Sequence, residues 1–129
     1  MPNTVVQTTL AGGANSRLVV RHITIISDGT QETNLVVYDN SAFRNDPLRG
    51  CLLQVQASGS SCVCRLAWQQ TTDFVATTVN PGSDNGNADF RLVGGVSNPG
   101  ATGATGDLRL TTIGLASGDA VTLVITVRQ

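Results

Sequence analysis

The residues of this sequence that could do chemistry are few, and they begin with its thiols and its one imidazole. The side chains able to ligate a metal, or to serve as nucleophile and base, are His22, Cys51, Cys62 and Cys64. A Cys-x-Cys pair in a strand points both thiols to one face, where the alternation also places Leu66 and Trp68. We therefore expect reduced thiols, buried as small apolar side chains. An odd number of cysteines also argues against a disulfide framework.

Three other patterns match functional motifs only in part. The chain has no Gly-x-Ser-x-Gly elbow, so we interpret His22 as a strand residue packed near an interface. Asp84, Asn85, Asn87 and Asp89 offer oxygen ligands, but without the length and terminal glutamate of a calcium loop. The glycine triplets of GATGATGD lack the lysine of a P-loop. The sequence therefore predicts no enzyme activity, no cofactor and no bound metal.

The composition favours β structure and offers little charge for binding another molecule. A chain of 129 residues is long enough for one domain with a real core. Charged residues make up 13% of it, about half the usual share. A net charge of −1 predicts no nucleic-acid partner, and no apolar run approaches the ~18 residues of a membrane span. The opening MPNTVVQTTL lacks the features of a secretion signal, so we expect a protein made in a cytoplasm.

Apolar and polar residues alternate in most segments of the chain, which predicts short β-strands. These strands would position the cysteines and His22. The alternation predicts three hairpins, which join residues 18–27 to 34–39, 51–57 to 62–69, and 108–112 to 121–127. In the second hairpin Leu53 lies opposite Leu66, and in the third Leu110 lies opposite Leu123. Residues 18–39 carry apolar side chains on both faces of their strands. We therefore expect these strands to be covered twice, by a second sheet or by a partner subunit.

The rest of the chain adds two strands, at residues 74–79 and 88–93, and a β-prone opening at residues 4–10. Turn-rich loops separate these eight or nine short strands, and no segment has a convincing helical pattern. We predict an all-β domain over residues 1–129, an antiparallel two-sheet sandwich of jelly-roll type, with a barrel as the alternative. An extended N-terminal arm is one option for residues 1–16. The predicted core contains Leu53, Val55, Leu66, Leu110, Leu123 and Ile125.

Three blocks of the sequence carry distinctive turn and strand signatures. They are SDGTQETNLVVYDNSAF at residues 27–43, LAWQQTTDF at residues 66–74, and FRLVGGVSNPGATGATGDLRLTTIGLASGDAVTLVITVR at residues 90–128. In order and spacing they resemble a family of small virion structural proteins from tailed bacteriophages, and the resemblance covers residues 23–129. Gln69 and Gln70 depart from it, since an acidic residue is expected after Trp68.

The resemblance implies a non-enzymatic virion protein, a decoration or cement protein on the capsid exterior that bridges major capsid subunits and stabilises the head. It also implies a homotrimer over local threefold axes. Because loops on a rigid scaffold commonly carry binding, the candidate capsid or subunit contacts are Phe43, Arg44, Arg49, Asn98, Thr102 and Thr105. A tail or head-closure protein remains an alternative. So does a receptor- or carbohydrate-binding sandwich, which would need exposed aromatic platforms.

Overall fold

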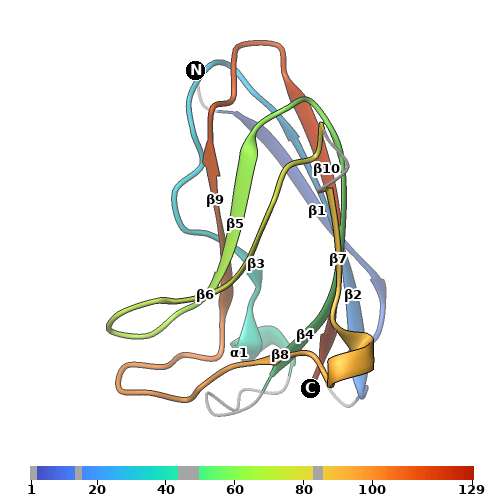
Figure 1. Ribbon diagram of the computed structural model, residues 1–129, viewed down its shortest axis with the longest axis vertical. Helices are drawn as coiled ribbons and strands as arrows, with labels where there is room; N and C mark the ends of the chain where they lie inside the picture. Colours follow the sequence, from blue (N-terminus) through green and yellow to red (C-terminus); the bar gives the residue numbers. More distant parts are fainter. Residues whose placement is uncertain (1–2, 14–15, 44–49, 83–85) are drawn as a thin grey trace.

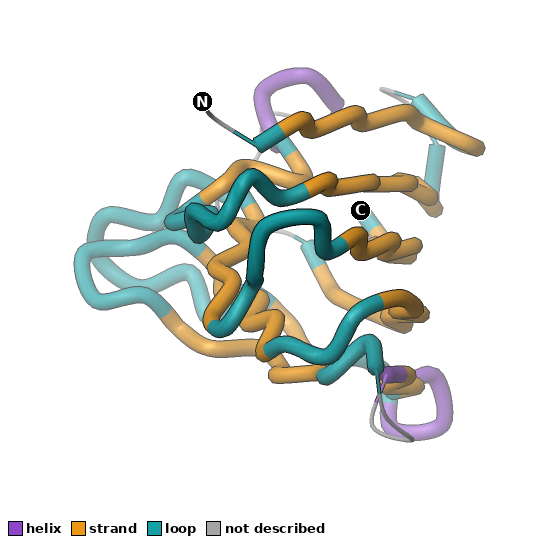
Figure 2. Tube along the Cα trace, turned by 90° about the horizontal axis from the view of Figure 1, so that it is seen from above, coloured by secondary structure: helices purple, strands orange, loops and turns teal. Residues whose placement is uncertain are grey.

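Two antiparallel β-sheets packed face to face make up the computed structural model of this chain (Figures 1 and 2), which describes residues 3–13, 16–43, 50–82 and 86–129. Sheet A consists, in spatial order, of β1 (Thr4–Ala11), β2 (Leu18–Ile26), β10 (Ala120–Arg128), β4 (Cys51–Gly59) and β7 (Asn87–Asp89), with β8 (Val96–Ser97) also paired to β4. Sheet B consists of β3 (Leu35–Tyr38), β9 (Leu108–Ile113), β5 (Val63–Trp68) and β6 (Phe74–Val79).

The order of the strands is that of a jelly roll. When β1 and β8 are left aside, the first of the remaining strands, β2, pairs with the last, β10. Moving inward along the chain from both ends, β3 pairs with β9, β4 with β7, and β5 with β6. A long two-stranded ribbon that folds over into two facing sheets gives this nesting. The predicted two-sheet, jelly-roll class is therefore confirmed, with ten strands in the described residues instead of eight or nine.

The core lies between the sheets, and the alternation of the sequence decides which side chains reach it. Along β10 every second residue from Val121 to Val127 is at most 1% exposed, while the residues between them face outward. Trp68 and Tyr38 are the largest fully buried side chains, and both come from sheet B. The predicted core residues that are buried are Val55, Leu66, Leu110, Leu123 and Ile125.

The three predicted hairpins are wrong, because the two strands of each lie in different sheets. β9 pairs with β3 and β5, whereas β10 pairs with β2 and β4, so Leu110 lies beside Leu35 and Leu66 and not beside Leu123. In the same way β2 separates from β3, and β4 from β5. Two strands with matching apolar faces share a core equally well as neighbours or as partners across a sandwich. The turns between them therefore cross from one sheet to the other.

Leu53 was predicted to be in the core, but it is only half-buried, and Leu52 is fully buried in its place. The cause is a register shift between Thr126 and Val127 of β10, which places Leu52 opposite Val127. Such a β-bulge inserts one extra residue and reverses the faces beyond it. Alternation read from one strand alone does not reveal a bulge in the pairing.

The N-terminal segment and two short helical turns also differ from expectation. Residues 4–11 are not a separate arm, because β1 pairs with β2 from Thr4–Ile26 to Ala11–Val20. A single helical turn, α1 (Asn40–Phe43), follows β3, and a 3₁₀ turn, η2 (Arg91–Val93), follows β7. The strand predicted at residues 88–93 is therefore short and ends before η2.

Candidate functional site

The described contact candidates come together at one end of the sandwich. We call this region the end cluster, and define it as residues 39–43, 69–73, 90–95 and 98–107. Figure 1 shows α1, β8 and η2 at the lower end, with the loops around residues 70 and 103 extending to the left. Phe43, Asn98, Thr102 and Thr105 belong to the end cluster, whereas Arg44 and Arg49 lie outside the described residues.

Backbone hydrogen bonds hold two loops of the end cluster side by side. The amide of Gln69 donates to the carbonyl of Asp107 (2.9 Å), and the amide of Thr105 donates to the carbonyl of Gln69 (3.3 Å). Further out, the amide of Thr71 donates to the carbonyl of Thr102 (3.0 Å). These bonds continue the pairing of β5 with β9 beyond the sheet, so the exposed side chains of Thr102 and Thr105 stand on a braced loop.

Asn40 ties α1 to the same loop from the other side. Its amide donates to the carboxylate of Asp107 (2.8 Å), and its side-chain amide donates to the carbonyl of Thr105 (3.2 Å). Gly106 allows this contact, because a Cβ added there would lie 2.6 Å from the carboxamide of Asn40. Burial raises the pKa of Asp107 above its ordinary value, and the hydrogen bond from Asn40 opposes that shift.

Phe43 and Asn98 are tied into the fold rather than presented on the surface. The Phe43 ring stacks on Tyr38 with centroids 5.3 Å apart, and Tyr38 meets Trp68 edge to face. Asn98 is 7% exposed, and its side-chain oxygen accepts the amide of Gly100 (3.0 Å). Both residues shape the end cluster, Phe43 partly buried and Asn98 buried, while Thr102 and Thr105 are the exposed candidates.

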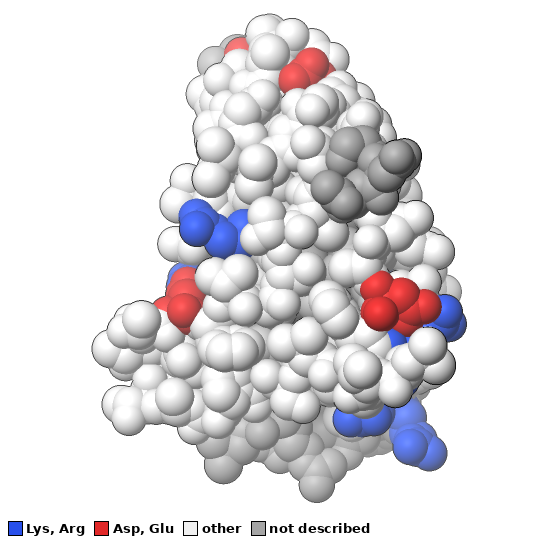
Figure 3. All heavy atoms as spheres, in the orientation of Figure 1, with Lys and Arg blue, Asp and Glu red and all other residues white. Residues whose placement is uncertain are grey.

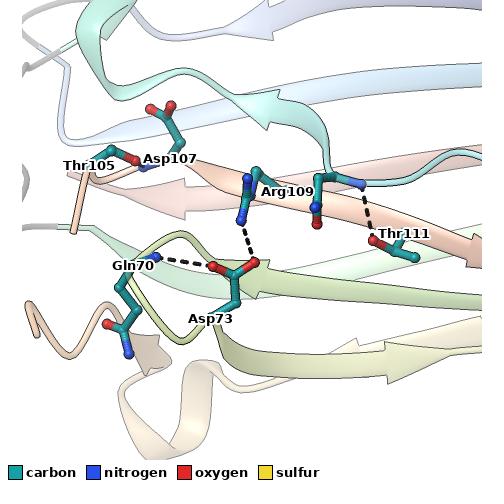
Figure 4. Close-up of polar contacts among 7 residues, drawn as sticks. Gln70, Asp73, Thr105, Asp107, Arg109 and Thr111 are labelled. Atoms are coloured by element: carbon teal, nitrogen blue, oxygen red, sulfur yellow. Dashed lines mark hydrogen bonds and ion pairs between the residues drawn. The ribbon is translucent and has the colours of Figure 1, made fainter. Parts of the chain in front are cut away.

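An ion pair lies at the base of the braced loops, on the outer face of sheet B (Figure 4). The guanidinium of Arg109 donates to the carboxylate of Asp73, whose other oxygen accepts the amide of Gln70 (3.2 Å). The Arg109 Nε and the Gln70 Oε1 are buried and have no hydrogen-bond partner within the described residues. Asp73 therefore links the start of β6 to β9 across the intervening strand β5, and it links the loop at residues 69–73 to the sheet.

The most exposed apolar residues lie on η2 and were not among the predicted contact residues. Leu92 is 100% exposed and Val93 79% exposed. The turn that carries them is braced, because the Asp89 carboxylate accepts from the backbone amide of Arg91 (3.0 Å) and from its guanidinium (2.6 and 2.9 Å). These bonds lower the pKa of Asp89 to about 2. A signal was available in Asp-x-Arg followed by Leu-Val-Gly-Gly, which suits a tight turn better than a strand.

Backbone bonds attach this turn firmly to sheet A. The amide of Phe90 donates to the carbonyl of Leu53 (2.8 Å), and the amide of Gly95 donates to the carbonyl of Phe90 (2.8 Å). Cys51 adds a bond from its thiol to the carbonyl of Gly94 (3.1 Å). Leu92 and Val93 are therefore held out by a rigid turn and not by a loose loop.

The residues considered for chemistry are dispersed in the fold. Cys62 and Cys64 are buried with their sulfurs 3.6 Å apart, and burial raises the pKa of both thiols. His22 lies on the outer face of sheet A, paired with Thr8 on one side and Val124 on the other. Within the described ranges, no group of three or more His, Cys, Asp or Glu side chains could hold a metal ion. No helix among those residues is long and apolar enough to cross a membrane.

Charged groups are sparse on the face shown in Figure 3, where uncharged atoms separate a few acidic and basic patches. Contacts made through this surface would therefore depend on shape and apolar area more than on long-range attraction. Comparison of the chain with protein-family models, with curated proteins and with solved structures finds no match. The likeness to phage virion proteins thus rests on the three sequence blocks alone.

Proposed function

We propose that this chain is a non-enzymatic structural protein of a tailed-bacteriophage particle. In this role it is a cement protein on the capsid exterior, a homotrimer that bridges neighbouring major capsid subunits and stabilises the head. The sequence blocks supply the class of protein, and the η2 turn is the observation that carries the contact. A leucine and a valine held outward on a braced turn suit insertion into an apolar pocket of another protein.

The energetics of η2 favour a binding role. Burying a Leu or Val side chain completely contributes roughly 1.5–3 kcal/mol. Because hydrogen bonds already fix the turn, docking would cost little further backbone entropy. The Asp89–Arg91 ion pair, which lies next to these two side chains, would belong to the polar rim of such an interface.

The shape of the end cluster supports contact with two neighbours at once. In Figure 1 η2 lies at the right of the lower end, and the braced loops at residues 69–73 and 98–107 extend to the left. One side of the end cluster would then meet one capsid subunit and the other side the next. Anything that binds only the assembled shell stabilises it by mass action, so particles would gain resistance to heat and to internal DNA pressure.

The carbohydrate-binding alternative finds less support in the aromatic side chains, all of which are described. Trp68 and Tyr38 are fully buried, and Phe43 and Phe90 pack against the core. Phe74 is the exposed one, at 41%. A sugar-binding platform needs flat exposed rings, and one phenylalanine provides little. A tail or head-closure role is separated from a cement role by copy number and location.

The test is to prepare particles lacking the protein, add the purified chain back, and measure bound copies and the temperature of DNA release. We expect native protein to bind at high copy number and to raise that temperature. The double variant Leu92→Ser/Val93→Ser should bind roughly a hundredfold more weakly, since about 3 kcal/mol of apolar burial is lost. The matched control is Val63→Ser/Ile113→Ser, which removes two aliphatic side chains that are 38% and 50% exposed on sheet B. Equal loss of binding in both variants would contradict the assignment of the contact to η2.

A further inference from the structure

Among the described residues the sandwich has four lateral edges, one of them shared by β7 and β8, and they differ in how well they are protected. On sheet B, β3 is covered by sheet A: the Gln7 side chain donates to the carbonyl of Val36 and Arg21 donates to that of Val37, both at 3.1 Å. The edge strand β6 has a bulge in its pairing with β5. On sheet A, β7 has three residues and ends in Asp89. Short strands, bulges, charges and covering groups all discourage pairing with another chain.

The fourth edge, β1, has none of these protections along residues 4–9. It pairs with β2 without interruption over this stretch, and its first bulge comes after Thr9. The sequence TVVQTTLA contains no charged residue and no proline. Five of its eight residues are β-branched, and Val6 is 56% exposed. No described strand lies on the other side of β1.

The hydrogen bonds of β2 reveal which backbone groups of β1 are free. Ser27 bonds to Asp119 through its amide and to Gly118 through its carbonyl, and the carbonyl of Arg17 bonds to Gln129. Odd-numbered residues of β2 therefore direct their backbone groups toward β10, and even-numbered ones toward β1. The partners of Ile26, Thr24 and His22 in β1 are the residues at positions 4, 6 and 8.

The backbone groups of Val5, Gln7 and Thr9 consequently point to the open side of β1. No backbone hydrogen bond joins them to another described segment. We infer that this edge pairs with β1 of a second copy of the chain, antiparallel and about a two-fold axis at Gln7. Val5 then pairs with Thr9 of the second copy, Gln7 with its own equivalent, and Thr9 with Val5. Each pair exchanges two backbone hydrogen bonds, so sheet A continues through the axis into the sheet of the second copy.

The chemistry of β1 favours a second copy as the occupant. A two-fold axis places equivalent residues near one another, so a charged edge would repel itself, and β1 carries no charge from Thr4 to Ala11. In this register the outer face of one sheet continues into the outer face of the other. Val6 lies opposite Thr8 of the second copy on that outer face, where both residues are exposed. On that face Val6 lies beside Thr24, and beyond it Thr122 and Ser58, none of which carries a charge. Thr8 lies beside His22, the one titratable side chain next to the proposed contact on this face. This contact joins copies in pairs and does not depend on the capsid proposal.

Sedimentation of the purified full-length chain tests the contact across micromolar to millimolar concentrations. The native chain should show an association that the variant Val6→Lys/Thr8→Lys weakens by at least roughly tenfold in Kd, since two like-charge pairs then face each other. The variant Val6→Lys/Thr8→Glu creates two opposite-charge pairs in the same register and should restore the association. Because both positions are exposed, thermal unfolding should show all variants folded.

The matched control is Val75→Lys/Thr78→Lys, which makes the same replacement at two exposed positions of the β6 edge and should leave the association unchanged. Three results would overturn the inference. They are a native chain that stays monomeric over the whole range, equal weakening by the β1 and β6 variants, and failure of the opposite-charge variant to recover the association that the like-charge variant loses.

Discussion

Replacement of Gly106 by alanine tests how the end cluster is held together. Gly106 has φ +83°, a left-handed conformation that strains an L-residue, and an added Cβ would lie 2.6 Å from the Cγ and Nδ2 of Asn40. Asn40 is 2% exposed and cannot move without losing its bonds to Asp107 and Thr105. The substitution therefore combines a backbone cost with the loss of the link between α1 and the loop.

A control separates the two costs. Gly114 has φ +90°, but apart from its two chain neighbours no described residue has an atom within 4 Å of a Cβ added there. A left-handed backbone destabilises the folded state by about 1–2 kcal/mol when the residue is alanine. Alanine also lowers the conformational entropy of the unfolded chain, which offsets ~0.4–1 kcal/mol of that loss. Gly114→Ala should therefore lower the free energy of unfolding by roughly 1 kcal/mol. Gly106→Ala should lose about 2 kcal/mol more, because two hydrogen bonds of ~0.5–1.5 kcal/mol each break around a buried amide.

Thermal unfolding followed by circular dichroism measures both variants. For a chain of this length the entropy of unfolding is ~0.27 kcal/mol/K, so each 1 kcal/mol shifts Tm by roughly 4 °C. We expect a drop of about 4 °C for Gly114→Ala and about 11 °C for Gly106→Ala. Equal drops would mean that the contact between Gly106 and Asn40 contributes nothing to stability.

Three further predictions concern single groups. Asp73→Ala should cost about 1–2 kcal/mol in urea denaturation, and adding Arg109→Ala should cost less than the sum of the single variants, because the ion pair is partly buried. Cys62 and Cys64 should react slowly with thiol reagents until the chain is denatured. Because burial raises their pKa in the folded state, the free energy of unfolding should fall as pH rises above the ordinary thiol pKa of about 8.5. The Asp89 carboxyl should titrate near pH 2 in an NMR experiment, and the bracing of η2 should be lost only as pH falls through that value; titration near its ordinary pKa would contradict the bracing.

The faces of most strands were predictable from the sequence, because burial follows alternation wherever no bulge interrupts the pairing; Leu53 is the exception in β4. Cys62, Cys64 and Leu66 point to the core, as their spacing indicates. The pairing of the strands was not predictable in this way. Leu110 packs in the same core as Leu123 whether their strands are neighbours or face each other, and the turn at residues 114–119 suits a hairpin as well as a crossing between sheets.

The end cluster was predictable in outline and not in its bonds. Glycine and polar residues identify residues 94–106 as a loop, but Thr102 and Thr105 are braced by backbone groups of Gln69 and Thr71, which the residue types do not encode. Leu92 was hidden by the apparent alternation of residues 88–93, since an apolar residue in a strand is expected to be buried. The turn signal around it, Asp-x-Arg followed by Leu-Val-Gly-Gly, indicates a break in the strand, and the fold shows that Leu92 faces solvent.

Cryo-electron microscopy of the intact particle would show where the protein binds and in how many copies. We expect density for this fold in many copies over the capsid surface, with the η2 turn seated against one major capsid subunit and the braced loops against the next. Density confined to the tail or to a single vertex, at about six or twelve copies arranged by rotational symmetry, would contradict this expectation.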